Sequence, residues 1–107
     1  PKHPDQSQFW TSRYSARGIN AMMNVVHEVT DLAFDKIQTP CLIFWTPQDK
    51  VVNIKKSLSI LNNLGSEKKI FIEFTTAEHV LAGHITAPEN VLKASETIAT
   101  FVNELIQ

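Results

Sequence analysis

Apolar residues change their spacing several times along the chain, and the changes predict alternating helices and strands. From residue 15 to about residue 32, apolar positions recur at steps of three and four, the spacing of one helical face. This face comprises Ile19, Met22, Val26, Val29 and Ala33. Ser15 is a good N-cap, because its hydroxyl can accept a hydrogen bond from a free backbone N–H in the first turn. Residues 1–14 show no clear period and are expected to be irregular.

Residues 41–45 form a continuous apolar run, Cys-Leu-Ile-Phe-Trp, that begins directly after Pro40. A proline cannot donate to a strand ladder, so it belongs at the beginning of a strand. A strand without a polar member is typical of parallel sheets that helices cover on both faces. The run therefore predicts a buried parallel strand, and the turn-forming residues 46–50 predict a loop after it.

A helix and a second strand are predicted next. Asn53 is a good N-cap for a helix over residues 54–64, and Gly65 stands where a C-terminal glycine ends a helix. The apolar stripe of this helix comprises Ile54, Leu58, Leu61 and Leu64. Residues 70–75, Ile-Phe-Ile-Glu-Phe-Thr, carry one polar position in an otherwise apolar alternation, which predicts a strand at or near a sheet edge.

The last pattern predicts a C-terminal helix. Residues 86–89, Thr-Ala-Pro-Glu, have the spacing of a capping box with proline in the first turn. The apolar face of this helix comprises Val91, Ile98, Val102 and Leu105, with Ala94 and Phe101 beside it. Helical crossovers imply parallel strands. Because two strands alone leave exposed edges, the sequence predicts a βαβα portion of an α/β fold with an incomplete sheet.

Composition excludes several function classes. The 107 residues are 43% hydrophobic with a net charge of −1, which offers no electrostatic reason to expect nucleic acid as a partner. No apolar run reaches the ~20 residues that span a bilayer. There is no CxxC pair for a zinc site, and no glycine directly follows a predicted strand, as a phosphate-binding loop requires. The sequence therefore predicts no metal, no cofactor and no membrane span, and it assigns no compartment.

An acid and a histidine each lie in a loop that follows a predicted strand. Asp49 comes after the first strand, and His79 comes after the second. In open α/β sheets ligands bind at the carboxyl ends of the strands, so these two loops should meet at one edge. A carboxylate beside a histidine orients the imidazole, which can then take a proton from a hydroxyl nucleophile and return it to a leaving group. His84 is the alternative histidine.

Two segments resemble the C-terminal part of α/β-hydrolases, above all the lipase, esterase and serine-aminopeptidase-like branch. They are residues 37–52, Ile-x-x-Pro-Cys-Leu-Ile-Phe-Trp-Thr-Pro-Gln-Asp-Lys-Val-Val, and residues 69–79, Lys-Ile-Phe-Ile-Glu-Phe…His. In that family the first segment carries the acid of a catalytic triad, and the loop after the last strand carries the histidine. The resemblance implies that Asp49 is the triad acid and His79 the histidine. Because Gly-His is a common form of the family's histidine motif, His84 stays the alternative.

The family's nucleophile has no counterpart in the sequence. There is no Gly-x-Ser-x-Gly motif, and Ser57 and Ser59 fall in the helix after the acid, where the family's order of Ser, Asp and His does not place them. The resemblance thus implies a C-terminal fragment of a serine hydrolase that acts on carboxylic esters or related acyl substrates. Residues 15–107 would be the C-terminal portion of its α/β domain, and residues 1–14 a candidate remnant of the cap.

This interpretation sets expectations about partners and alternatives. The expected partner is the missing N-terminal half of the hydrolase or a second copy of the chain, which would pair with exposed strand edges. The chain alone is expected to lack triad chemistry. Three alternatives remain. One is a dehalogenase-like or epoxide-hydrolase-like enzyme with an aspartate nucleophile, and another is a non-catalytic fragment that self-associates through its strand edges. The third is an unrelated Rossmann-like βα module in which Asp49 and His79 meet by coincidence.

Overall fold

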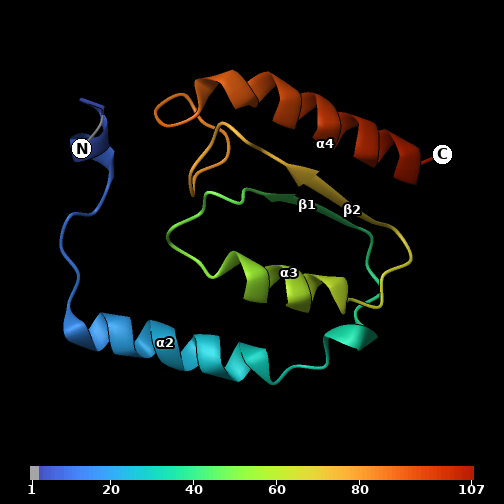
Figure 1. The fold of residues 1–107 in the computed structure, drawn as a ribbon, viewed down its shortest axis with the longest axis horizontal. Coiled ribbons are helices and arrows are strands. Elements are labelled where there is room, and N and C mark those ends of the chain that lie inside the picture. Colours follow the sequence, from blue (N-terminus) through green and yellow to red (C-terminus); the bar gives the residue numbers. More distant parts are fainter. Residues whose placement is uncertain (1–2) are drawn as a thin grey trace. The chain divides into compact units, whose positions relative to one another are not determined.

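The computed structural model of this chain describes residues 3–107, which form two compact units (Figure 1). One unit extends to Ala33, and the other spans Phe34–Gln107. The first unit holds a one-turn helix, α1 (Gln6–Phe9), and a longer helix, α2 (Ala16–Thr30). The short helix lies in the stretch that the sequence predicted to be irregular.

Helix α2 begins where the sequence predicts. The Ser15 hydroxyl oxygen accepts a hydrogen bond from the Gly18 backbone N–H at 3.0 Å, as an N-cap should. The helix ends at Thr30, two residues before the predicted end, and thus before Ala33. Its predicted apolar face is exposed to solvent in the described chain: Ile19, Met22, Val26 and Val29.

The second unit is built on a two-stranded parallel sheet. Strand β1 (Cys41–Trp45) pairs with β2 (Lys69–Glu73) from one end of the two strands to the other. Helix α3 (Ile54–Asn62) lies on one side of the sheet and α4 (Val91–Leu105) on the other (Figure 1). The parallel α/β arrangement of this unit agrees with the sequence prediction.

The buried core lies at the carboxyl end of the sheet. Its buried members are Phe74, Ala77, Ala87 and Ala94, with Phe44, Ile72, Leu81 and Ala82 packed against them. The rings of Phe44 and Phe74 meet edge to face, with centroids 5.3 Å apart. All five residues of β1 are only half-buried in the described chain, so the strand is less buried than predicted, although helices lie on both sides of the sheet (Figure 1). Two strands and two flanking helices provide too little surface to cover it.

Helix α3 is capped as predicted, but Gly65 does not have the predicted role of a C-terminal glycine. Asn53 Oδ1 accepts a hydrogen bond from the Lys56 N–H at 3.1 Å, and the helix ends at Asn62. Gly65 does not have the left-handed backbone of a C-terminal glycine. A Cβ atom at this position would instead lie 2.0 Å from the carbonyl oxygen of Asp35, in the short helix η1 (Phe34–Lys36). Glycine is needed here for a close backbone approach.

Helix α4 differs from the prediction in its start and in its packed face. The short helix η2 (Pro88–Asn90) precedes it, and no side-chain capping bond forms at either start, so the predicted capping box is absent. The predicted stripe is exposed: Val91, Ile98, Val102 and Leu105. The buried or half-buried residues are instead Ala94, Thr97 and Phe101. The small side chain of Ala94 explains how the helix approaches the core closely.

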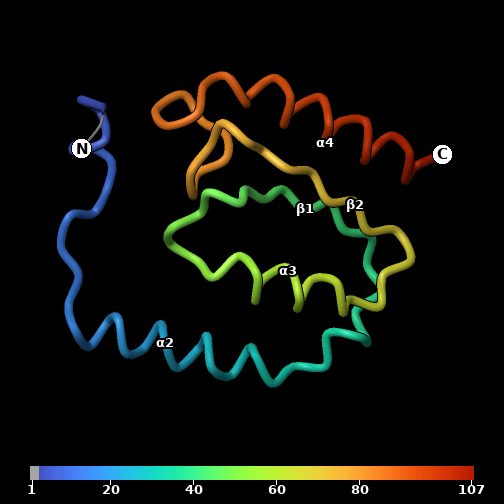
Figure 2. Tube along the Cα trace, viewed as in Figure 1, coloured from blue at the N-terminus to red at the C-terminus, as the bar shows by residue number. Residues whose placement is uncertain are grey.

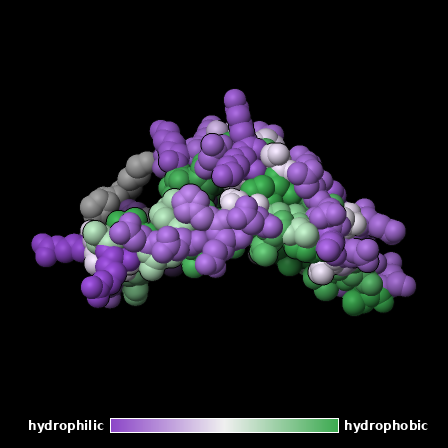
Figure 3. Space-filling model, turned by 90° about the horizontal axis from the view of Figure 1, so that it is seen from below, coloured by the Kyte–Doolittle hydropathy of each residue, from purple (hydrophilic) through white to green (hydrophobic). Residues whose placement is uncertain are grey.

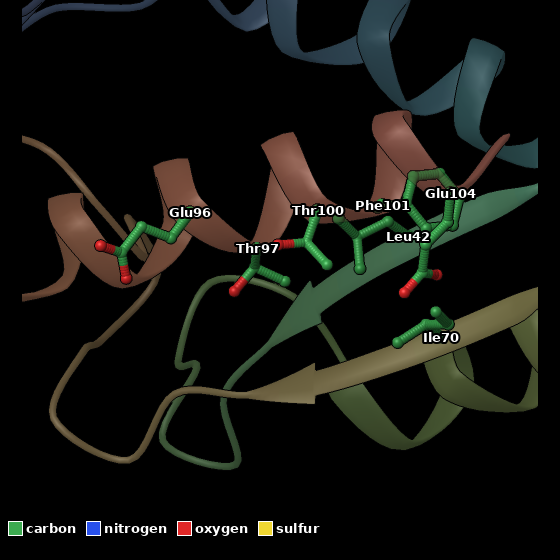
Figure 4. A pocket seen from close by; sticks show the side chains of 7 residues that line it. All are labelled: Leu42, Ile70, Glu96, Thr97, Thr100, Phe101 and Glu104. Carbon is green, nitrogen blue, oxygen red and sulfur yellow. The ribbon is translucent and has the colours of Figure 1, made fainter. Parts of the chain in front are cut away.

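Hydrophobic side chains consequently reach the surface in several places between polar ones (Figure 3). A pocket of about 250 Å³ also opens between α4 and the sheet (Figure 4). Its floor holds Leu42 from β1 and Ile70 from β2, and its remaining wall comes from α4.

Within residues 3–107, no helix is both long enough and apolar enough to cross a membrane.

Candidate functional site

The loops that follow β1 and β2 leave the sheet at the same end, because the two strands are parallel (Figure 2). The Phe74 N–H donates to the Trp45 carbonyl at 2.8 Å, which continues the pairing of the two strands one residue beyond β2. One loop carries Asp49, and the other carries His79. The topology therefore brings together residues that are thirty positions apart in sequence.

Asp49 and His79 are in direct contact. His79 Nδ1 lies 2.9 Å from Asp49 Oδ2. The other carboxylate oxygen, Oδ1, accepts hydrogen bonds from the backbone N–H groups of Val51 at 2.8 Å and Val52 at 3.0 Å. The backbone amides of residues 51 and 52 thus fix the carboxylate and leave its second oxygen for the imidazole.

The environment of Asp49 keeps its carboxylate charged. Burial by itself would raise the pKa of this carboxyl group, since its side chain is only 7% exposed. The hydrogen bonds from His79, Val52 and Val51 and the charge of the imidazole outweigh burial, so the pKa lies below its ordinary value of 3.8. At neutral pH Asp49 is therefore a charged acceptor.

The contact determines which proton a neutral His79 must hold. An ionised carboxylate can only accept hydrogen bonds, so the bond to Asp49 requires a proton on His79 Nδ1. The lone pair is then on Nε2. The His79 side chain is 46% exposed, so the ring is open to solvent. This arrangement provides an oriented base that lies at the rim of the sheet.

His84 is not part of this contact. It lies in an exposed turn between Gly83 and Ala87, which are bridged by two backbone hydrogen bonds of 3.3 and 3.0 Å. The described residues provide no hydrogen bond or ion pair to its side chain. Of the two candidate histidines, the structure brings only His79 to Asp49.

Three polar residues near the pair were not singled out from the sequence. Thr46 and Asn90 are buried, and Thr76 is bonded to Asn90. Thr46 is the first polar residue after an apolar strand, and Asn90 directly precedes α4. These positions mark element boundaries, which is a weak indication of function, because serine, threonine and asparagine are common at such boundaries for local reasons.

The described residues supply no nucleophile to this pair. No serine hydroxyl of residues 3–107 hydrogen bonds to His79, and Ser57 and Ser59 lie within α3. The pocket beside α4 is lined by neither Asp49 nor His79, so it is a separate feature. Across the same residues, no three His, Cys, Asp or Glu side chains are grouped to hold a metal ion.

Comparisons with protein-family models, with curated proteins and with solved structures find no match to this chain. The resemblance to α/β-hydrolases therefore remains an expectation drawn from the sequence.

Proposed function

We propose that this chain supplies the acid and the histidine of a catalytic triad in a serine hydrolase of the α/β-hydrolase type. The substrate class is carboxylic esters or related acyl compounds, and the nucleophilic serine comes from outside these residues. One observation carries the proposal: Asp49 Oδ2 and His79 Nδ1 lie 2.9 Å apart in the loops that follow two parallel strands. This is the place where α/β folds bind ligands, and it is the acid–base pair that the triad needs.

The proposed reaction is ordinary acyl transfer. Nε2 of His79 takes the proton of the serine hydroxyl while the serine oxygen bonds to the acyl carbon and the carbonyl oxygen becomes an oxyanion. When the oxyanion collapses, the ester C–O bond breaks and the imidazolium gives its proton to the departing alcohol. A water molecule then releases the acid by the same two steps. Asp49 holds the ring and stabilises its charged form throughout.

The test is the esterase activity of the natural full-length protein on short p-nitrophenyl esters. His79→Ala should lower kcat at least about 1,000-fold, because it removes both the general base and the general acid. Asp49→Asn should also lower kcat strongly. The matched control is His84→Ala, which should change kcat by less than about threefold. Activity that survives in His79→Ala would contradict the assignment.

The identity of the nucleophile separates this proposal from a dehalogenase-like or epoxide-hydrolase-like enzyme. A fluorophosphonate should label one serine of the full-length protein, and labelling should fall in His79→Ala. An aspartate nucleophile would escape the reagent, and in H₂¹⁸O its carboxylate would incorporate the heavy isotope during a single turnover. Isotope in an aspartate, with no labelled serine, would replace the first proposal with the second.

A second candidate function is self-association, which the sheet favours. Its two strands pair only with each other in the described chain, and every residue of β1 is half-buried. Open strand edges can pair with another copy. Light scattering after size exclusion should then show a dimer or a larger oligomer at micromolar concentration. A folded monomer under these conditions would exclude this candidate.

A further inference from the structure

Two buried polar side chains lie beside the Asp49–His79 pair. Thr46 is 1% exposed and Asn90 is 6% exposed. A buried hydroxyl or amide destabilises a fold unless its polar atoms find partners. No buried side-chain nitrogen or oxygen in the described residues lacks a hydrogen bond. The partners of Thr46 and Asn90 therefore show which backbone segments these two side chains hold.

Thr46 connects the loop of the acid with the loop of the histidine. Its hydroxyl donates to the Ala77 carbonyl at 3.0 Å and accepts from the Gln48 N–H at 3.2 Å. Its own carbonyl accepts from the Asp49 N–H at 3.4 Å. One residue thus contacts the backbone of the acid itself and the backbone two positions before His79.

Asn90 connects the two sides of the histidine loop. Its Oδ1 accepts from the Thr76 hydroxyl at 3.1 Å, and its Nδ2 donates to the Leu81 carbonyl at 2.9 Å. These partners lie three residues before and two residues after His79. Asn90 is also the last residue of η2, directly before α4, so a helix supports the bridge.

These attachments of the loop matter because few other contacts hold the ring of His79. Its side chain is 46% exposed, and its hydrogen-bond partner in the described chain is Asp49. Packing therefore restricts the ring only weakly, and an unattached loop would sample many positions. Bonds at residues 76, 77 and 81 surround the histidine and reduce that freedom.

We propose that Thr46 and Asn90 are positioning residues that fix the loop of His79 so that its imidazole meets Asp49. Their importance for catalysis rests on the proposed function, whereas their effect on the contact itself does not. Preorganising a base in this way removes an entropic cost from the reaction, and a misplacement of about 1 Å can lower a rate roughly 100-fold. The alternative is that both residues only satisfy buried polar groups and stabilise the fold.

The experiment measures the contact directly by NMR on the full chain. Thr46→Val removes the hydroxyl with little change in volume, and Asn90→Leu removes the amide. In both variants the titration midpoint of the Asp49 carboxyl carbon should move upward toward its ordinary value. The ¹⁵N spectrum should show a smaller fraction of His79 with its proton on Nδ1. Both changes have the same cause, because the hydrogen bond between His79 and Asp49 is formed a smaller fraction of the time.

Controls separate positioning from stability. Ser66→Ala removes another buried hydroxyl, 4% exposed, which donates to the Ile37 carbonyl at 3.3 Å and lies 3.8 Å from Cys41 Sγ. It should lower the urea midpoint and leave both NMR signals unchanged. Thr46→Ser retains a hydroxyl, so the Asp49 midpoint and the His79 tautomer should be as in the wild type. Thr76→Val changes an exposed position, so it offers a milder break of the Asn90 bridge if the buried variants do not fold.

The two proposals fail in different ways. If Thr46→Val, Asn90→Leu and Thr76→Val lower stability but leave the Asp49 midpoint and the His79 tautomer as in the wild type, the positioning role is wrong. If the wild-type full-length protein hydrolyses no ester, the proposed function alone is wrong. In an active enzyme, the positioning role also requires a drop in kcat of up to roughly 100-fold with little change in KM. An unchanged kcat in a variant with shifted NMR signals would contradict its catalytic importance.

Discussion

The carboxyl end of the sheet and the outer face of α4 belong to one unit but differ in how their side chains are held. At the carboxyl end, Phe74 and Ala77 are at most 2% exposed, and the buried Thr46 has hydrogen-bond partners. On the outer face of α4, Ile98 and Val102 are 48% and 47% exposed. Burial and polar contacts are thus concentrated beneath the Asp49–His79 pair. A site can therefore be locally fixed while much of its sheet and helices stays exposed to solvent.

The largest expected effect comes from Phe74→Ala, which attacks the well-held end. The ring of Phe74 is 1% exposed, packs edge to face on Phe44 and lies under Lys93 Nζ, 4.4 Å from its centroid. Its removal should lower the free energy of unfolding by about 3–5 kcal/mol, because it leaves a cavity in the core. Urea unfolding followed by circular dichroism measures the loss.

The control for this variant is Val102→Ala on the outer face of α4. Because that side chain is 47% exposed, its truncation should cost about 0.5 kcal/mol or less. Equal losses for Phe74→Ala and Val102→Ala would mean that the contrast between the two regions is wrong in solution.

Gly65→Ala should have the next largest effect, at the opposite end of the sheet. The new Cβ would lie 2.0 Å from the Asp35 carbonyl oxygen, and the backbone of Asp35 cannot move away without a cost in stability. We expect a loss of about 1–3 kcal/mol in the same urea assay, as for an overpacked core. The control is Gly18→Ala, whose Cβ would meet only the Ser15 side-chain oxygen at 3.1 Å. A neutral Gly65→Ala would show that this end of the unit is loosely held.

Asn53→Ala should have a smaller effect. Asn53 Oδ1 caps α3 through the Lys56 N–H, and loss of an N-cap costs about 1 kcal/mol. Thermal unfolding measures the change in Tm. Asn20→Ala, at an exposed position inside α2, is the matched control and should leave Tm nearly unchanged or slightly higher. A drop in Asn20→Ala equal to that in Asn53→Ala would contradict the cap.

The pH dependence of Asp49 is the finest test. Because the pKa of this carboxyl group is lower in the folded chain than its ordinary 3.8, the charged form stabilises the fold at pH values above 3.8. That stabilisation is lost as the pH falls through the lower, folded-state pKa. Wild type should therefore exceed Asp49→Asn in urea midpoint at pH 6, and the difference should shrink below pH 3.8.

The same comparison in a His79→Gln background isolates the histidine. The hydrogen bond from His79 is the strongest of the contributions that lower the pKa of Asp49. When residue 79 is glutamine, the difference in urea midpoint between Asp49 and Asp49→Asn proteins should therefore be smaller. A wild-type advantage that does not change with pH would show that the carboxylate is not stabilised by its contacts.

The local elements could be read from the sequence because their causes are local. The N-caps Ser15 and Asn53 and the two strands each depend on neighbouring residues, and the structure has all of them, although β2 covers Lys69–Glu73 rather than residues 70–75 and its burial does not alternate. The packed face of α4 could not be read in this way. Its apolar residues occupy a wide arc, and helical spacing does not say which edge of the arc meets the sheet.

The candidate site could likewise be predicted only in part from the sequence. Parallel strands place their following loops at one edge, so the proximity of Asp49 and His79 followed from element order. The choice against His84 needed the path of the loop, which depends on contacts with distant residues. The role of Thr46 was hidden for the same reason: its partner, Ala77, lies 31 positions away.

Sequence patterns were enough to predict helices α2, α3 and α4, the two strands and the edge of the sheet at which an acid and a histidine meet. These features follow from hydrogen-bond capping, side-chain periodicity and the direction of parallel strands, which are short-range or topological causes. The tertiary structure decided which histidine meets the acid, which side of α4 is buried and why residue 65 is glycine. Each of these depends on the packing of segments far apart in sequence, which no local pattern records.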